Sequence, residues 1–236
     1  MHLPFCVVKC GYCDFHSLAD VPELEMGRVV DAILAELEHK RALLHEGAAA
    51  YTVFLGGGTP TQLPTSLLAR LLNGICNTIS VSDLREFTSE ANPESLTQEK
   101  LDVLAEHGVR RLSLGVQSFD EDRLRFLDRP HDVAGAHAAL HRLQEDGRFE
   151  FSLDLIYGIP GQSIQDWEEE LRQGLAFGSG HLSAYHLSFE TGTKLEARRV
   201  RGEVQEHDQE KQRSFFECTH DLLAQAGRPA YEISNF

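Results

Sequence analysis

The alternation of two apolar patterns constrains the fold of this chain more than any other feature of its sequence. Short apolar runs typical of buried strands are separated by segments whose apolar residues recur every three or four positions. The predicted strands are Tyr51–Gly56, Leu84–Ala91, Val109–Val116, Phe149–Gly158 and His181–Phe189. Strands that alternate with helices pair in parallel through right-handed crossovers. We therefore expect an α/β fold with a parallel sheet, closed into a barrel or partial barrel or else open and doubly wound.

The intervening segments are predicted to be amphipathic helices, because residues spaced by three and four lie on one helix face. One helix is expected from Pro22 to Leu44, and five more at residues 67–75, 101–104, 136–143, 167–175 and 215–223. Ser118 and Ser163 are each followed three residues later by an acidic residue, a pattern that resembles a capping box. The polar stretch 191–211 is expected to be a loop leading into the last helix.

Composition excludes several classes of protein. The net charge of -15 argues against a nucleic-acid-binding surface, which would be basic. We find no apolar run long enough to span a bilayer and no signal-peptide pattern at the start. The five cysteines are an odd number, and three of them are clustered, which is not typical of a secreted disulfide framework. A cytoplasmic location is therefore expected.

The three clustered cysteines, Cys6, Cys10 and Cys13, form a C-x3-C-x2-C pattern. Zinc usually takes a fourth ligand, often from a second C-x2-C pair, and the chain has no such pair. Cys76 and Cys218 stand alone in apolar helical segments and are expected to behave as small hydrophobic residues. A 4Fe–4S cluster held by three cysteines leaves one iron without a protein ligand. Three cysteines therefore fit a cluster whose fourth ligand is a substrate or cofactor.

The segment HLPFCVVKCGYCDF, from His2 to Phe15, resembles the signature of radical S-adenosylmethionine (SAM) enzymes. More narrowly, it resembles the family that contains oxygen-independent coproporphyrinogen III oxidase and the HemW-type haem chaperones. The resemblance continues through FLGGGTPT, SEANPESL, RLSLGVQSF, DRPH, DLIYGIPGQ, HLSAYHLSFETGT and AYEISNF. It implies a partial (β/α)6 radical SAM barrel with parallel strands, with its chemistry at the carboxyl ends of the strands.

The same resemblance implies the cofactors. Cys6, Cys10 and Cys13 would bind an Fe4S4 cluster, and the amino and carboxylate groups of SAM would chelate the open iron. Reductive cleavage of SAM would then yield methionine and a 5'-deoxyadenosyl radical, with the electron supplied by a reducing donor. The residues that the resemblance assigns to SAM binding are Gly57, Gly58, Thr59, Glu90, Gln117, Arg129 and Asp154.

Each of these assignments has a structural alternative. The glycine run could be an ordinary strand-to-helix turn, and Arg129 could be a surface charge at a helix end. Asp154 lies within an apolar strand, where burying an unpaired carboxylate would be costly. The purely structural alternative is therefore weaker for Asp154 than for Arg129.

Phe15 distinguishes two branches of the family. The oxidase carries a further cysteine two positions after the third cluster cysteine, and this chain has Phe15 there. The CDF form resembles the haem chaperone branch, which binds haem and passes it to acceptor proteins. We therefore expect a haem chaperone of tetrapyrrole metabolism, with haem as a further ligand. The alternatives are an oxidase that converts coproporphyrinogen III to protoporphyrinogen IX, or a non-enzymatic iron–sulfur protein. SAM cleavage is possible in principle, so enzymatic activity is left open, and no catalytic residue is assigned.

Residues 1–236 are expected to form a single radical SAM core domain that is truncated at both ends, with an incomplete first strand and no C-terminal domain. Among the twelve histidines, His131, His181 and His186 are candidates for a haem ligand. None of the three is assigned that role.

Overall fold

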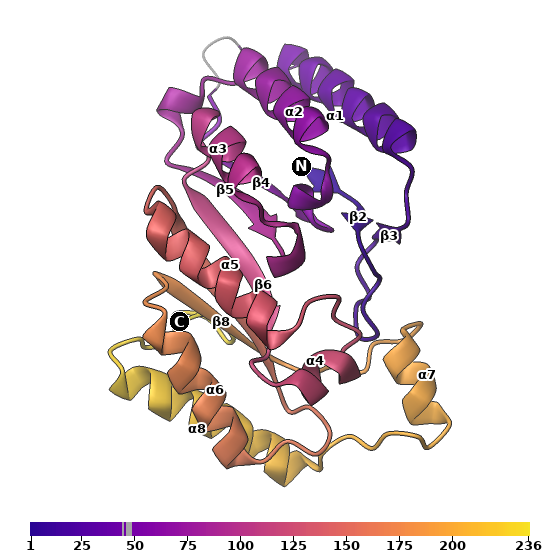
Figure 1. Ribbon diagram of the computed structural model, residues 1–236, viewed down its shortest axis with the longest axis vertical. Helices are drawn as coiled ribbons and strands as arrows, with labels where there is room; N and C mark the ends of the chain where they lie inside the picture. Colours follow the sequence, from indigo (N-terminus) through magenta and orange to yellow (C-terminus); the bar gives the residue numbers. More distant parts are fainter. Residues whose placement is uncertain (44, 46–48) are drawn as a thin grey trace.

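The computed structural model describes residues 1–43, 45 and 49–236. Its centre is a six-stranded sheet in the order β1-β4-β5-β6-β7-β8, and every neighbouring pair is parallel. Figure 1 shows the sheet curving, with helices along its outer side. The predicted parallel α/β fold is confirmed, and β1 and β8 form the two edges of an open barrel.

The strands of the sheet are β1 (His2–Leu3), β4 (Thr52–Gly57), β5 (Glu86–Ala91), β6 (Arg111–Gln117), β7 (Glu150–Tyr157) and β8 (His181–His186). A separate parallel pair consists of β2 (Phe5–Cys6) and β3 (Leu18–Ala19). The helices are α1 (Glu23–Leu43), α2 (Thr65–Thr78), α3 (Gln98–Glu106), α4 (Glu121–Phe126), α5 (Val133–Asp146), α6 (Ile164–Ala176), α7 (Lys194–Val200) and α8 (Gln209–Gln225). Three short 3-10 helices are η1 (Pro60–Gln62), η2 (Val81–Asp83) and η3 (Pro93–Ser95).

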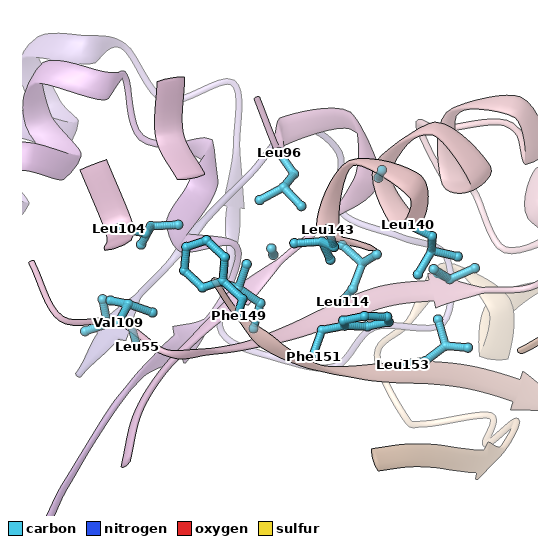
Figure 2. Packing of buried hydrophobic residues seen from close by; sticks show 14 of the residues in the cluster. Leu55, Leu96, Leu104, Val109, Leu114, Leu140, Leu143, Phe149, Phe151 and Leu153 are labelled. Carbon is cyan, nitrogen blue, oxygen red and sulfur yellow. The ribbon is translucent and has the colours of Figure 1, made fainter. Parts of the chain in front are cut away.

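The main hydrophobic core lies between the sheet and the helices. Successive side chains of a strand point to opposite faces, so alternate residues of each strand reach this core. On β6 and β7 these include Leu114 and Leu153, which are fully buried. Figure 2 shows them beside Leu140 and Leu143 of α5. Burying each such leucine contributes about 1.5–3 kcal/mol to folding.

The opposite face of the same strands is polar. Ser152 Oγ donates a hydrogen bond to Ser113 Oγ at 3.0 Å, and Ser113 Oγ donates to Asp154 Oδ2 at 3.1 Å. These residues alternate along the strands with the core leucines. The curvature of the sheet thus encloses hydroxyl and carboxyl groups on its inner face while its outer face packs against helices.

Several predictions of local structure are confirmed, with shifted boundaries. The five predicted strands correspond to β4 to β8, although β5 begins at Glu86 and β8 ends at His186. Ser163 forms the predicted capping box with Asp166 at the start of α6. The first predicted helix corresponds to α1, and Leu44, where that prediction ended, lies outside the described residues.

Two predictions of local structure are wrong. Ser118 does not cap α4, because Asp120 is the N-cap and accepts a hydrogen bond from Arg123 N. The stretch 191–211 is not only a loop, because it contains α7, which Thr193 caps. The first error arises because both Ser118 and Asp120 are able to cap a helix, and the sequence does not say which one does.

Candidate functional site

The cysteine-bearing loop is fixed from both sides. Its ends are joined by the pairing of β2 with β3, and the Cys13 amide donates a hydrogen bond to Cys10 O at 3.1 Å. The Gly11 amide donates to Leu127 O at 3.3 Å, and Gly11 O accepts from the Leu195 amide at 2.7 Å. The loop is therefore held between the end of α4 and the start of α7. All three of its cysteines are half-buried and form no disulfide.

A cavity of about 350 Å³ opens beside this loop, at the carboxyl ends of the parallel strands. Strand ends of this kind are where barrel enzymes place their chemistry. All ten residues predicted for the site line this one cavity: Cys6, Cys10, Cys13, Gly57, Gly58, Thr59, Glu90, Gln117, Arg129 and Asp154. Segments far apart in the sequence thus meet at one cavity.

The glycine run packs tightly against the segment that leads to Cys6. A Cβ atom on Gly57, whose φ is +101°, would lie 2.1 Å from His2 Nδ1. A Cβ atom on Gly58 would lie 2.7 Å from Leu3 O. The Thr59 amide then donates to Phe5 O at 2.7 Å. Glycine is therefore required here for the approach of the cysteine-bearing segment, a reason that sequence reasoning missed.

Arg129 crosses the cavity wall instead of lying at an exposed helix end. Its Nη2 donates to Asn92 Oδ1 and to Gly115 O, both at 2.8 Å, and its Nη1 donates to Cys10 Sγ at 3.3 Å. Its Nε is buried and has no hydrogen-bond partner. A buried donor without a partner is costly, and a bound carboxylate would satisfy it.

Two carboxyl groups face the same cavity. Glu90 accepts a hydrogen bond from the Gly57 amide at 2.9 Å, and Asp154 accepts one from Ser113. Burial raises the pKa of both carboxyls above their ordinary values. Desolvated acceptors of this kind suit the amino group or the ribose hydroxyls of a ligand.

Gln117 ends β6 in a left-handed conformation, with φ of +70°. A backbone of this kind is uncommon for a residue other than glycine. The pairing of β6 with β7 is irregular at the same point, between Gly115 and Gln117. Gln117 Nε2 would lie 2.8 Å from a Cβ atom on Gly115, so the glycine leaves room for this side chain.

Asn92 and Tyr12 are site residues that sequence reasoning missed. Asn92 Nδ2 donates to Thr59 Oγ1 at 2.8 Å, while its Oδ1 accepts from Arg129. Tyr12 lines the cavity between Cys10 and Cys13, and burial raises the pKa of its hydroxyl. Their positions inside the motifs SEANPESL and CGYC were the available signal.

The three candidate histidines do not gather at one place. Of the three, His186 lines the cavity, and its buried Nε2 lies against Gly158 with no hydrogen-bond partner. His131 lies beside Glu94, and His181 Nε2 and the Tyr231 hydroxyl are 2.7 Å apart.

Among the residues that the structure describes, no three His, Cys, Asp or Glu side chains are placed to hold a single metal ion. A 4Fe–4S cluster makes a different demand, because each cysteine binds a separate iron at a separate corner. Three free thiols line one cavity, and thiolates are the ligands that such a cluster requires. No helix in the described part of the chain is long and apolar enough to cross a membrane.

Comparison with known proteins places these features in a family. A family model described as the radical SAM superfamily matches residues 1–173. Curated relatives named heme chaperone HemW are 34% identical in Lactococcus lactis, 35% in Bacillus subtilis and 35% in Escherichia coli. Each comparison covers all of this chain and 60 to 62% of the relative, so the chain spans about three fifths of their length.

Solved structures agree with the fold. The coproporphyrinogen III oxidase of Escherichia coli, described as a radical SAM enzyme, superimposes with a TM-score of 0.87 at 25% identity. That comparison covers 100% of this chain and 54% of the oxidase. SuiB of Streptococcus suis, solved with S-adenosylmethionine bound, has a TM-score of 0.62 at 17% identity over 98% of this chain and 49% of its own, and shows the fold alone. The chain belongs to the radical SAM superfamily, and membership of this superfamily implies a 4Fe–4S cluster and SAM as cofactors.

Proposed function

We propose that this protein is a haem chaperone built on a radical SAM core, which binds haem and transfers it to an acceptor protein. The observation that carries this proposal is Phe15. Its side chain lines the cavity beside Cys13 and is 61% exposed, at the position where the family's oxidase has a further cysteine. A phenylalanine provides an apolar surface at the cavity mouth and no thiol. The names of the HemW relatives support the same function.

Cys6, Cys10 and Cys13 would hold the cluster, and the cavity wall beside them would hold SAM. Arg129 offers an unpartnered donor to a carboxylate, and Glu90 and Asp154 offer acceptors. Gly57, Gly58, Thr59 and Gln117 complete the wall. When bound, the cluster and SAM supply reductive cleavage of the sulfonium bond. The chain's own part is to orient these groups and to keep water from them.

The partners in this proposal are haem or a porphyrinogen, a reducing electron donor and a haem-acceptor protein. We place the protein in the cytoplasm, which agrees with its unpaired cysteines. Residues 1–236 are proposed to act as one core domain, which the continuous six-stranded sheet supports.

The second candidate is an oxygen-independent coproporphyrinogen III oxidase. The superposition of the whole chain on the Escherichia coli oxidase favours it. Phe15 argues against it, because the thiol found in the oxidase is missing here. A third candidate is a non-enzymatic iron–sulfur protein. Four polar side chains that such a protein would not need line the cavity, and they argue against it: Glu90, Gln117, Arg129 and Asp154.

Anaerobic product analysis tests the proposal. Protein reconstituted with iron and sulfide would be supplied with SAM, a reductant and coproporphyrinogen III, and a parallel sample would be titrated with haem. We expect no protoporphyrinogen IX and about one haem bound per chain. Catalytic formation of protoporphyrinogen IX that is lost in Cys6→Ala and retained in Cys218→Ala would instead establish the oxidase.

A further inference from the structure

A chain of hydrogen bonds joins two of the three cluster cysteines across the cavity wall. Cys6 Sγ lies 3.8 Å from Thr59 Oγ1, and Thr59 Oγ1 accepts from Asn92 Nδ2 at 2.8 Å. Asn92 Oδ1 accepts from Arg129 Nη2 at 2.8 Å, and Arg129 Nη1 donates to Cys10 Sγ at 3.3 Å. We call these five residues the thiol belt. Asn92 lies at the centre of the belt, and the hydrogen bonds of its amide go to Thr59 and Arg129.

The chemistry of the partners fixes the direction of both hydrogen bonds of the Asn92 amide, and a Cys6 thiolate bound to iron could only accept from Thr59. A guanidinium can only donate, so the oxygen of Asn92 must face Arg129 and its nitrogen must face Thr59. Because Thr59 Oγ1 accepts from Asn92, its hydroxyl hydrogen is free to point at Cys6 Sγ. Asn92 thereby directs a donor toward a cysteine sulfur at each end of the belt.

The segment that carries Asn92 is held independently of the belt. Asn92 directly follows β5 and is the N-cap residue of η3, which begins at Pro93. Two residues on, Glu94 Oε2 lies 3.3 Å from His131 Nδ1, and His131 Nε2 lies 3.0 Å from Val116 O. The side chain of His131 is 1% exposed. Its contact with Glu94 therefore fixes η3 against the loop that carries both His131 and Arg129. Asn92 is therefore presented to Arg129 by a rigid support.

We propose that Asn92 is a positioning residue that aims the Arg129 guanidinium at the cofactor and directs the Thr59 hydroxyl at Cys6, and so sets both SAM affinity and the reduction potential of the cluster. The inference rests on the proposed cofactor site. Hydrogen bonds to cluster sulfurs are among the factors that set such potentials, and donating bonds raise them.

Two substitutions separate the halves of this role. Asn92→Leu removes both hydrogen bonds of the amide, so we expect SAM affinity to fall about tenfold and the midpoint potential to fall. Asn92→Asp still accepts from Arg129 and should bind SAM nearly as the parent does. Its carboxylate, however, also accepts from Thr59 and draws that hydroxyl away from Cys6. The matched control is Asn73→Leu, at an exposed asparagine of α2 far from the cavity.

The experiment measures SAM dissociation constants and cluster midpoint potentials of reconstituted protein, with Thr59→Val made in the parent and in Asn92→Asp. Thr59→Val should lower the midpoint potential of the parent and change that of the Asn92→Asp protein little. The charge added by Asn92→Asp is present both with and without Thr59→Val, so it does not affect this comparison. Equal effects of Thr59→Val in the two backgrounds, or an Asn92→Leu protein with parental affinity and potential, would overturn the inference. A parent that binds cluster and SAM but not haem contradicts only the chaperone function. A parent that assembles no cluster overturns both.

Discussion

The two faces of the central sheet differ in almost every physical respect, although the same strands form both. On the helix-facing side, β6 and β7 contribute Leu114 and Leu153, which are fully buried in the hydrophobic core cluster. On the inner side, the intervening residues Ser113, Ser152 and Asp154 form a hydrogen-bonded row that leads to the cavity. Because successive side chains point to opposite faces, alternate residues of each strand pack in the core, and the residues between them face the cavity side.

The difference between the apolar and the polar face determines what a substitution on each face costs. A void on the outer face costs stability in proportion to the packing that is lost. In the cavity that the inner face borders, the Arg129 Nε is left without a partner, so part of the stability is spent on maintaining a site for a ligand. Substitutions on the two faces should therefore separate folding from ligand binding.

The largest expected effect concerns the cysteines. Cys6, Cys10 and Cys13 line the cavity, whereas Cys76 and Cys218 belong to the helices on the outer side. Replacing any one of the first three by alanine should abolish the reconstituted 4Fe–4S spectrum, because each is expected to bind its own iron. Cys76→Ala and Cys218→Ala should keep it. An intact cluster in all three motif variants would remove the distinction between the two groups.

On the outer face, Leu153→Ala should lower the free energy of unfolding by about 2–5 kcal/mol, as measured by urea denaturation. Ser152→Ala, the adjacent residue on the inner face, should cost about 0.5–1.5 kcal/mol, because it removes one hydrogen bond. If the two variants were equally destabilised, the assignment of stability to the outer face would be wrong.

In the cavity beside the inner face, Arg129→Ala should weaken SAM binding by about ten- to a hundredfold, the equivalent of about 1.5–3 kcal/mol. Asp154→Asn should weaken it in the same direction, and both proteins should keep their cluster. Calorimetric titration of the reconstituted proteins provides the measurement. Parental affinity in both variants would show that these residues have only a structural role.

The smallest expected effect is a pH dependence of stability that has opposite signs for two carboxyl groups of the cavity, Glu94 and Glu90. Burial opposes the ionisation of Glu94, but the hydrogen bond from His131 and the charge of Arg129 outweigh it, so the pKa of Glu94 lies below its ordinary value of 4.5. Its contribution to stability is therefore complete above pH 4.5 and is lost as the pH falls through the lower, folded-state pKa. Glu90, whose pKa is raised by burial, should contribute in the opposite direction, with stability lost as the pH rises through its folded-state pKa.

Unfolding free energies of Glu94→Gln and Glu90→Gln across acidic pH would test this difference. Glu94→Gln should reduce the loss of stability that occurs as the pH falls through the folded-state pKa of Glu94. Glu90→Gln should reduce the loss of stability that occurs as the pH rises through the folded-state pKa of Glu90. The same slope change in both variants would contradict the opposite signs.

The sequence predicted the strands and the cavity residues because both depend on local signals. Apolar periodicity located β4 to β8, and motif positions located the cysteines and Arg129. The part that could not be predicted depends on contacts between distant segments. The thiol belt pairs Asn92 with Arg129, 37 positions away, and the contact of His2 with Gly57 depends on the register of β1 against β4. No local pattern specifies such pairs.

We propose that one cavity holds both a three-cysteine cluster and SAM, with SAM bound to the open iron. Electron–nuclear double resonance of the reduced, reconstituted protein with SAM labelled with 15N at the amino group tests it most directly. We expect a hyperfine coupling between that nitrogen and the cluster, because a cluster held by Cys6, Cys10 and Cys13 would leave one iron open in the cavity that Arg129, Glu90 and Asp154 also line. A fully assembled cluster that shows no coupling to labelled SAM at saturating concentration would contradict it.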